Sequence, residues 1–236
     1  MRHSLPIMLL VLLPGLAACE AFSDPSFPTA FDTSIEVVSE GAGQEFGPEL
    51  FPAGDGDRWL YMENGDEETA WITWPTGKTT EVNAEQVPIW MQRGNYGTNE
   101  AWTLVTKDAV QDYGNVFRLN PCTIPRLHFP VRIGKVWRTD CTSDGYLNSE
   151  ATVLTVERVR TDVGWFSAVR INYVIHRASG SGSTLDWWLQ GPPEANETWW
   201  FAPGIGVVKR EYAQGHFHVL RHARVGGKDA AGDWKE

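Results

Sequence analysis

Alternation of apolar and polar residues is the feature that most limits the fold of this chain, and it is clearest between residues 165 and 176. In a β-strand, successive side chains point to opposite faces of the sheet. One face of this segment would carry Trp165, Ser167, Val169, Ile171, Tyr173 and Ile175, and the other, more polar face would carry Phe166, Ala168, Arg170, Asn172, Val174 and His176. A period of two over this length predicts a strand with one face in the core.

Shorter strand-like segments occur along most of the chain. They are residues 59–63, 69–74, 78–83, 87–93, 101–107, 115–119, 152–160, 198–201, 207–213 and 217–225. Turn-forming sequences lie between them: Asn64-Gly65, Pro75-Thr76-Gly77, Asp144-Gly145 and Gly180-Ser181-Gly182. Many short strands with frequent turns indicate an all-β protein, and we expect a curved antiparallel sheet or half-barrel.

A short repeat divides the strands into two sets. The pattern Phe51-Pro52-x3-Gly56-x2-Trp59 recurs as Phe129-Pro130-x3-Gly134-x2-Trp137, and a turn and a strand follow each copy. We therefore expect two related β units, residues 35–125 and 126–225. Residues 20–34, rich in Ser, Pro, Thr and Ala, predict a tether, and the Gly-rich residues 226–236 predict a disordered tail.

The first 19 residues predict export and lipidation. A basic start at Arg2 and an apolar run over residues 5–13 are typical of a signal peptide, here residues 1–18. The run is shorter than the roughly 20 residues of a spanning helix. Leu16-Ala17-Ala18-Cys19 resembles the lipobox of bacterial lipoproteins, which implies cleavage before Cys19 and its acylation. Glu20 replaces the aspartate that retains such proteins at the inner membrane, so we expect an outer-membrane anchor facing the periplasm.

The charge of the chain is unevenly distributed. Residues 19–125 carry 18 acidic and 5 basic residues, whereas residues 126–236 carry 12 acidic and 14 basic residues. The acidic first half would repel phosphates, so we expect nucleic acid not to be a partner. We expect the membrane to be a partner through the lipid anchor.

Three cysteines fit an exported lipoprotein. With Cys19 acylated, Cys122 and Cys141 remain, and an oxidising compartment permits them to pair. We predict this disulfide, which would close a loop of about 20 residues and stabilise the fold by about 3 kcal/mol in the chain-entropy model.

A second resemblance covers residues 129–213. It includes the repeat copy at Phe129 and the sequence Thr198-Trp199-Trp200-Phe201-Ala202-Pro203-Gly204-Ile205-Gly206-Val207-Val208-Lys209-Arg210. Here a strand ends in aromatic-Ala-Pro-Gly-x-Gly and the next begins Val-x-Lys, which resembles uncharacterised bacterial envelope β-proteins. The resemblance implies a curved antiparallel sheet similar to the half-barrels of Lol-type lipoprotein carriers, and it implies no activity.

Two sets of side chains are candidates for a site. His216 and His218 would lie on the solvent face of a strand about 6.6 Å apart, close enough to share a metal ion if a third ligand came from elsewhere. The alternative is a solvated edge. The pairs Trp187-Trp188 and Trp199-Trp200 would each place one indole in the core and one outward. Trp188 and Trp200 are therefore our candidates for binding an apolar or glycan ligand, with ordinary core packing as the alternative.

No sequence motif marks a catalytic residue or a cofactor. The chain contains no Gly-x-Ser-x-Gly, His-Glu-x-x-His or phosphate-binding glycine loop. A pair of carboxylates as in glycosidases would not be visible in sequence. The sequence favours a noncatalytic binding or interaction module of the cell envelope. A hydrolase acting on an envelope glycan or lipid and a structural envelope component are the alternatives.

Overall fold

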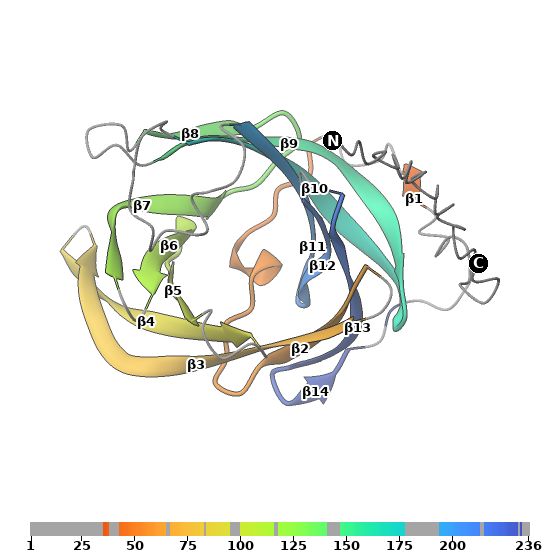
Figure 1. Cartoon of the computed structure of the whole chain (residues 1–236), viewed down its shortest axis with the longest axis horizontal. Coiled ribbons are helices and arrows are strands. Elements are labelled where there is room, and N and C mark those ends of the chain that lie inside the picture. Colours follow the sequence, from red (N-terminus) through yellow and green to blue (C-terminus); the bar gives the residue numbers. More distant parts are fainter. Residues whose placement is uncertain are drawn as a thin grey trace, which may run out of the picture. The chain divides into compact units, whose positions relative to one another are not determined.

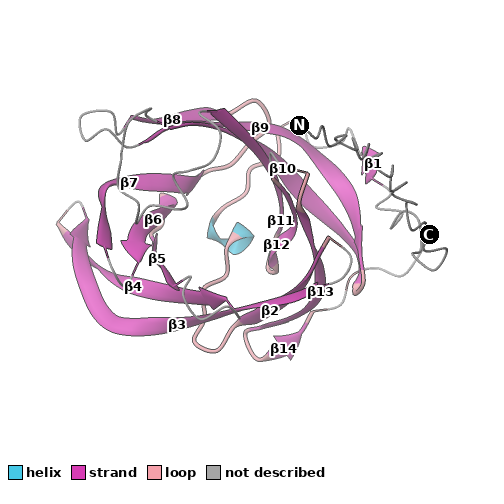
Figure 2. Cartoon of the chain, viewed as in Figure 1, coloured by secondary structure: helices cyan, strands magenta, loops and turns pink. Residues whose placement is uncertain are grey.

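The fold is an antiparallel sheet that curls around a short 3₁₀ turn (Figures 1 and 2). It comes from a computed structural model that describes residues 35–37, 43–64, 67–82, 84–94, 100–115, 118–140, 147–177, 194–212, 215–230 and 232. The chain divides into two units, Met1–Phe31 and Asp32–Glu236, and all of the described residues belong to the second.

Strands dominate this unit. In chain order the elements are β1 (Ile35–Val37), η2 (Pro48–Leu50), β2 (Arg58–Glu63), β3 (Glu67–Val82), β4 (Glu85–Gly94), β5 (Glu100–Val105), β6 (Ala109–Asn115), β7 (Arg118–His128), β8 (Val136–Asp140), β9 (Leu147–Thr161), β10 (Gly164–Arg177), β11 (Glu194–Ala202), β12 (Gly206–Glu211), β13 (Phe217–Val225) and β14 (Lys228–Asp229). Hydrogen-bonded neighbours run β1-β9-β10-β11-β12-β13-β2-β3-β4-β5-β6-β7, while β8 pairs with β9 and β14 with β13. The predicted all-β class and curved antiparallel sheet are confirmed.

The two copies of the repeat have the same backbone geometry. Gly56 and Gly134 both have φ of 81°, a left-handed conformation that glycine adopts without steric cost. The Gly56 N–H donates to the Thr73 carbonyl on β3, and the Gly134 N–H donates to the Val153 carbonyl on β9. A strand follows each glycine, so the two copies of the repeat have the same local structure. The division into two related β units, residues 35–125 and 126–225, stays a prediction.

The two junctions between these units differ. β13 pairs with β2 along a ladder that joins the end of the second unit to the start of the first. Among the described residues, no corresponding ladder joins β7 to β8. The Trp137 indole instead donates to the Pro125 carbonyl at 3.0 Å, and the Tyr173 hydroxyl donates to the Arg126 carbonyl at 2.7 Å. Side chains therefore hold this junction where backbone bonds hold the other.

The buried apolar residues form an inner core, a second core and a small cluster. The inner core is enclosed by the sheet and includes Leu50, Phe51, Leu127, Phe129, Val153, Ile171, Trp199 and Phe201. The second core includes Trp59, Tyr61, Val159, Phe166, Ala168, Trp200, Val208, Leu220 and Ala223. The small cluster contains Val87, Ile89 and Leu104.

Strand β10 contributes to both large cores, which corrects the prediction of one core face. Ile171 is buried in the inner core, whereas Phe166 and Ala168, on the face expected to be polar, are buried in the second core. The reason is that the end of the β9–β10 hairpin lies against β13, where the Asp162 N–H donates to the Leu220 carbonyl at 3.2 Å. Residues of β13 therefore cover the face of β10 that we expected to be exposed.

Some predicted element boundaries were wrong. The expected turn at Pro75-Thr76-Gly77 is a register shift inside the single long strand β3, where Gly77 has φ of 73°. The expected strand at residues 115–119 spans the end of β6 and the start of β7. The prolines of β7 hid this strand in the sequence, and its position at the end of the ladder order tolerates their missing N–H groups.

The predicted disordered tail is ordered in part. Gly226 and Gly227 have positive φ and connect β13 to β14. The Gly226 N–H donates to Asp57 Oδ1 at 2.8 Å, and the Gly232 N–H donates to the Val163 carbonyl at 2.7 Å. Gly226 and Gly227, which we expected to lie in a disordered tail, therefore form a tight turn.

The features expected at the start of the chain lie outside the described residues. These are the signal peptide 1–18, Cys19 and the tether 20–34. Cys141 and the side chain of Cys122 are also outside them, so the disulfide stays a prediction. Within the described ranges, no helix is long and apolar enough to cross a membrane.

Candidate ligand-binding cavity

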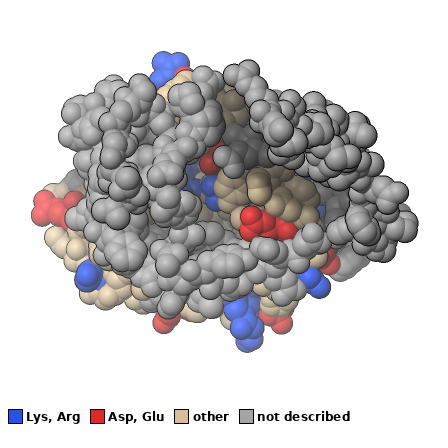
Figure 3. Space-filling view, viewed as in Figure 1, with Lys and Arg blue, Asp and Glu red and all other residues tan. Residues whose placement is uncertain are grey.

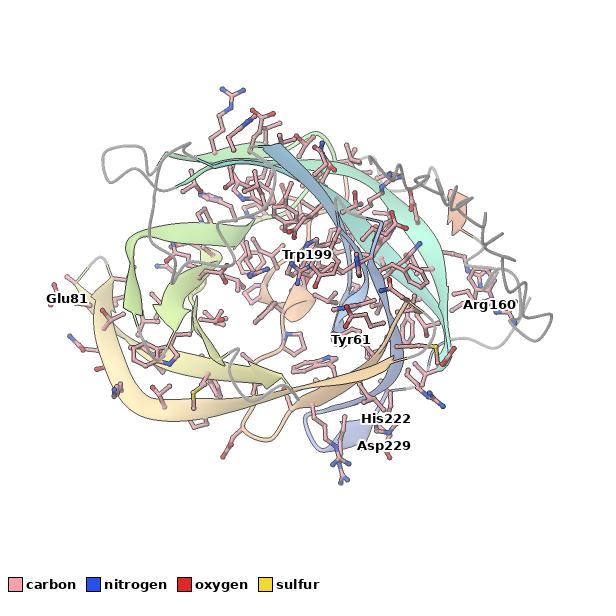
Figure 4. The ribbon with its side chains drawn as sticks, viewed as in Figure 1. Tyr61, Glu81, Arg160, Trp199, His222 and Asp229 are labelled. Atoms are coloured by element: carbon pink, nitrogen blue, oxygen red, sulfur yellow. The ribbon has the colours of Figure 1, made fainter. Side chains whose placement is uncertain are left out.

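A cavity of about 90 Å³ opens between the inner core and the strands that carry the second core. It is lined by Phe51, Pro52, Trp59, Tyr61, Arg126, Trp199, Gly206, Val207, Arg210 and His218. Figure 3 shows that this side of the molecule is hollowed, with charged side chains inside the hollow. Figure 4 shows Trp199 and Tyr61 inside the curl of the sheet, whereas Glu81, Arg160, His222 and Asp229 lie at its outside.

Hydrogen bonds fix the wall that β2 contributes. The Trp59 indole N–H donates to the Ile205 carbonyl at 2.6 Å, and the Tyr61 hydroxyl donates to the Val207 carbonyl at 2.9 Å. Gly206 has φ of 94°, and a Cβ there would lie 3.4 Å from Pro52 Cδ. These contacts hold the turn between β11 and β12 against the segment that precedes β2.

The two adjacent tryptophans of β11 have different surroundings. Trp199 lines the cavity and packs against Phe201, with ring centroids 5.9 Å apart. Trp200 is only 1% exposed in the second core, where its indole donates to Glu157 Oε2 at 2.9 Å. Both faces of β11 are therefore covered. Trp200 packs in the second core and does not line the cavity, so Trp199 replaces it as the candidate for ligand binding. Trp188 lies outside the described residues.

Arg210 is held between aromatic rings and a carboxylate. Its Cζ lies 3.9 Å from the ring centroids of both Trp199 and Tyr212. Its Nη2 donates to Glu197 Oε2 at 2.8 Å, and the Trp199 indole donates to the same oxygen at 3.1 Å. Burial alone would raise the pKa of Glu197, but Arg210, the hydrogen bond from Trp199 and the charge of Arg126 together outweigh burial and hold that pKa below the ordinary value. Glu197 is therefore ionised and fixes the guanidinium plane.

Arg126 is the second cation of the cavity wall. Its Nε donates to Asp112 Oδ1 at 2.6 Å, and its Cζ lies 4.5 Å from the Trp199 ring centroid. Burial alone would lower the pKa of Arg126, but Asp112, Glu197 and Tyr173 together outweigh burial, so the pKa is raised and the guanidinium stays charged. A guanidinium carries five N–H groups, and the bond to Asp112 uses only the one on Nε. The N–H groups of the two terminal nitrogens therefore remain as donors.

The two histidine candidates lie near one carboxylate. His218 Nε2 is 3.3 Å from Glu63 Oε2, and His216 Nδ1 is 4.0 Å from Glu63 Oε1. Within the described residues, no group of three or more metal-binding side chains is present. The third ligand that a metal ion at His216 and His218 would need is therefore not found among those residues.

We expected His218 on the solvent face of β13, and this prediction was wrong, because its side chain is only 7% exposed. A register shift between Leu220 and His222 changes the alternation of the strand, so His218, Leu220 and Ala223 are all buried. Burial lowers the pKa of His218 despite the attraction of Glu63, so the imidazole is neutral near pH 7.

Sequence reasoning missed Arg126, Arg210 and Tyr61 as residues of the site. Trp59 was visible through the repeat, and Arg210 ends the aromatic-Ala-Pro-Gly segment. No spacing connects Arg126 to Arg210, because β7 and β12 meet only through the curl of the sheet. The combined wall joins flat apolar surfaces to guanidinium donors.

Comparisons with known proteins identify no family for this chain. No family model matches it, and no curated protein matches it. One similar solved structure is a "putative lipoprotein" from Parabacteroides distasonis, with 11% identity and a TM-score of 0.39, covering 74% of this chain and 97% of that one. Another is a "putative exported protein with YmcC-like fold" from Bacteroides fragilis, with 15% identity and a TM-score of 0.36, covering 73% and 97%.

Proposed function

We propose that this protein is a membrane-anchored lipoprotein of the cell envelope that binds a small, largely apolar ligand in the cavity beside Trp199. The lipobox-like sequence that ends at Cys19 supports the address. The observation that carries the binding function is the cavity itself, which joins four aromatic side chains to two arginines. Concave sites with mostly apolar walls and a few placed polar groups are typical of small-molecule binding.

The wall favours an apolar ligand over a glycan. Sugar hydroxyls need acceptors as well as donors, and the lining residues that the structure describes include no Asp, Glu, Asn or Gln. Glu197, which lies behind the wall, is ionised and bonded to Arg210 and Trp199, so it does not serve as a general acid. These contacts support a binding function over a hydrolase.

Filling the cavity tests the binding function. Val207 lines it, and Val207→Phe would occupy space that a ligand needs. Leu154→Phe is the matched control, because Leu154 is 41% exposed on β9 and does not line the cavity. We expect ring-sized fragments such as benzene derivatives to bind the natural protein in saturation-transfer NMR, and at least tenfold more weakly to Val207→Phe. Equal binding by both variants would place the ligand elsewhere and refute the proposal.

Globomycin tests the anchor separately. Inhibition of lipoprotein signal cleavage should leave a precursor that retains residues 1–18 and is detectable by mass spectrometry. A precursor that is processed normally under the drug would contradict lipidation of Cys19, and it would leave the binding function intact.

A further inference from the structure

We infer that the cavity selects ligands in which a ring carries a carboxylate, an inference that rests on the proposed binding function. The ring would lie among Trp199, Trp59 and Phe51, and the carboxylate would accept hydrogen bonds from Arg126. Four observations support this class of ligand: the charge of the wall, the donors on its arginines, the flat surfaces beside them, and the size of the space.

The charged side chains that line the cavity are of one sign. Arg126 and Arg210 line it, whereas their carboxylate partners Asp112 and Glu197 do not. Each carboxylate therefore orients its arginine from outside the cavity. The ion pairs also cancel most of the net charge, so selectivity for an anion would come from the placement of donors and not from a general positive field.

The arginine donors are incompletely used. Nε of Arg210 is buried and has no hydrogen-bond partner in the part of the chain that the structure describes. Arg126 bonds Asp112 through Nε, and its terminal nitrogens form the part of the guanidinium that matches a carboxylate in a two-point contact. The terminal nitrogens of Arg126 are thus donors for an acidic ligand, and no side-chain carboxylate among the described lining residues competes for them.

The flat surfaces beside these donors suit a ring. Trp199 lies next to both guanidinium groups, at 4.5 Å from Arg126 Cζ and 3.9 Å from Arg210 Cζ. Trp59 donates to Ile205 in the β11–β12 turn and Tyr61 donates to Val207 at the start of β12, so their rings do not need to be ordered when a ligand binds. Rigid aromatic walls favour a flat, apolar group over a flexible chain.

The size of the cavity limits the ligand to a small one. A water needs roughly 10–15 Å³ of comparable space, so about 90 Å³ suits a ligand with about as many heavy atoms as a substituted six-membered ring. A lipid acyl chain or an oligosaccharide would exceed this space.

A charge series on one ring tests the inference. Benzoate, benzamide and benzylamine differ in charge but share a ring, and cyclohexanecarboxylate keeps the charge on a nonaromatic ring. We expect benzoate to bind the full chain at least tenfold more tightly than benzamide or benzylamine in NMR titrations. Cyclohexanecarboxylate should bind more weakly than benzoate and more tightly than benzylamine. Equal affinity for benzoate and benzamide would overturn the inference and leave the binding function standing, whereas no binding by any fragment would overturn both.

Variants of Arg126 show whether the carboxylate is recognised where we place it. Arg126→Gln should remove most of the preference for benzoate over benzamide, while Arg138→Gln, at an exposed position on β8, should keep it. Arg126→Lys keeps the charge but loses the planar fork, so it should also lose most of the preference, and it is the second variant if Arg126→Gln does not fold. A preference for benzoate that survives in Arg126→Lys would overturn the assignment.

Discussion

The carboxylate of Glu157 shows how a single residue specifies the second core. Its side chain is 1% exposed, and it accepts hydrogen bonds from the Trp200 indole at 2.9 Å and from Arg170 Nη1 at 3.2 Å. A buried charge is tolerated only when it is paired and hydrogen-bonded. Trp200 and Arg170 therefore depend on Glu157, and Trp200 has a structural role next to the cavity residue Trp199.

Removal of this carboxylate should be costly. Glu157→Ala would leave the Trp200 indole and Arg170 without their acceptor, and we expect a loss of about 3–5 kcal/mol in the free energy of unfolding, measured by urea denaturation. Glu150→Ala is the control on the same strand, because the Glu150–Arg138 pair is solvent-exposed and should contribute less than about 1 kcal/mol. Similar losses for the two variants would contradict the structural role of Glu157.

Glu197 gives a pH dependence with a defined sign. Its pKa in the folded protein lies below the ordinary value of 4.5, so the ionised form is favoured by folding. The stability that this residue contributes is complete above about pH 4.5 and is lost as the pH falls through the lower pKa of the folded state. Glu197→Gln should therefore make the free energy of unfolding less dependent on pH below 4.5. An unchanged acid limb in urea denaturation at several pH values would contradict this assignment.

At the scale of elements, alternation and turns predicted much of the sheet but not its connections. Strands β2, β4, β10 and β13 lie where the sequence placed them, because each has a clear apolar face or ends at a turn. β7 was missed because Pro121 and Pro125 weaken its pattern, and β3 was divided in two because an internal glycine resembled a turn. The cavity could not be predicted, because it combines β2, β7, β11, β12 and β13, whose proximity depends on the whole curl of the sheet.

The predicted disulfide now has a structural setting. Cys122 belongs to β7, and Cys141 follows Asp140, the last residue of β8. A bond between them would connect β7 to the end of β8, and these two strands share no ladder among the described residues. We expect Cys122→Ser to lower the free energy of unfolding by about 3 kcal/mol. The measurement is urea denaturation of protein isolated from the envelope with and without reductant, and two free thiols in its mass spectrum would refute the bridge.

At the scale of the whole described unit, the two junctions between the predicted β units, β13 with β2 and β7 with β8, should differ in local stability. β13 has hydrogen-bonded neighbours on both sides, β12 and β2, whereas β6 is the one strand that pairs with β7 among the residues that the structure describes. Backbone amides of β13 should therefore exchange with solvent more slowly than those of β7. Hydrogen–deuterium exchange followed by mass spectrometry measures this directly, and equal protection of the two strands would indicate that β7 has a partner on its other side.

The short connection between β7 and β8 affects how far their junction depends on backbone pairing. Residues 129–135 tether the two strands, and a short tether gives a high effective concentration of one strand at the other. β2 and β13 lie at distant points of the chain, so their ladder brings together segments that no such tether holds. The backbone ladder therefore lies at the junction where the covalent chain supplies the least constraint.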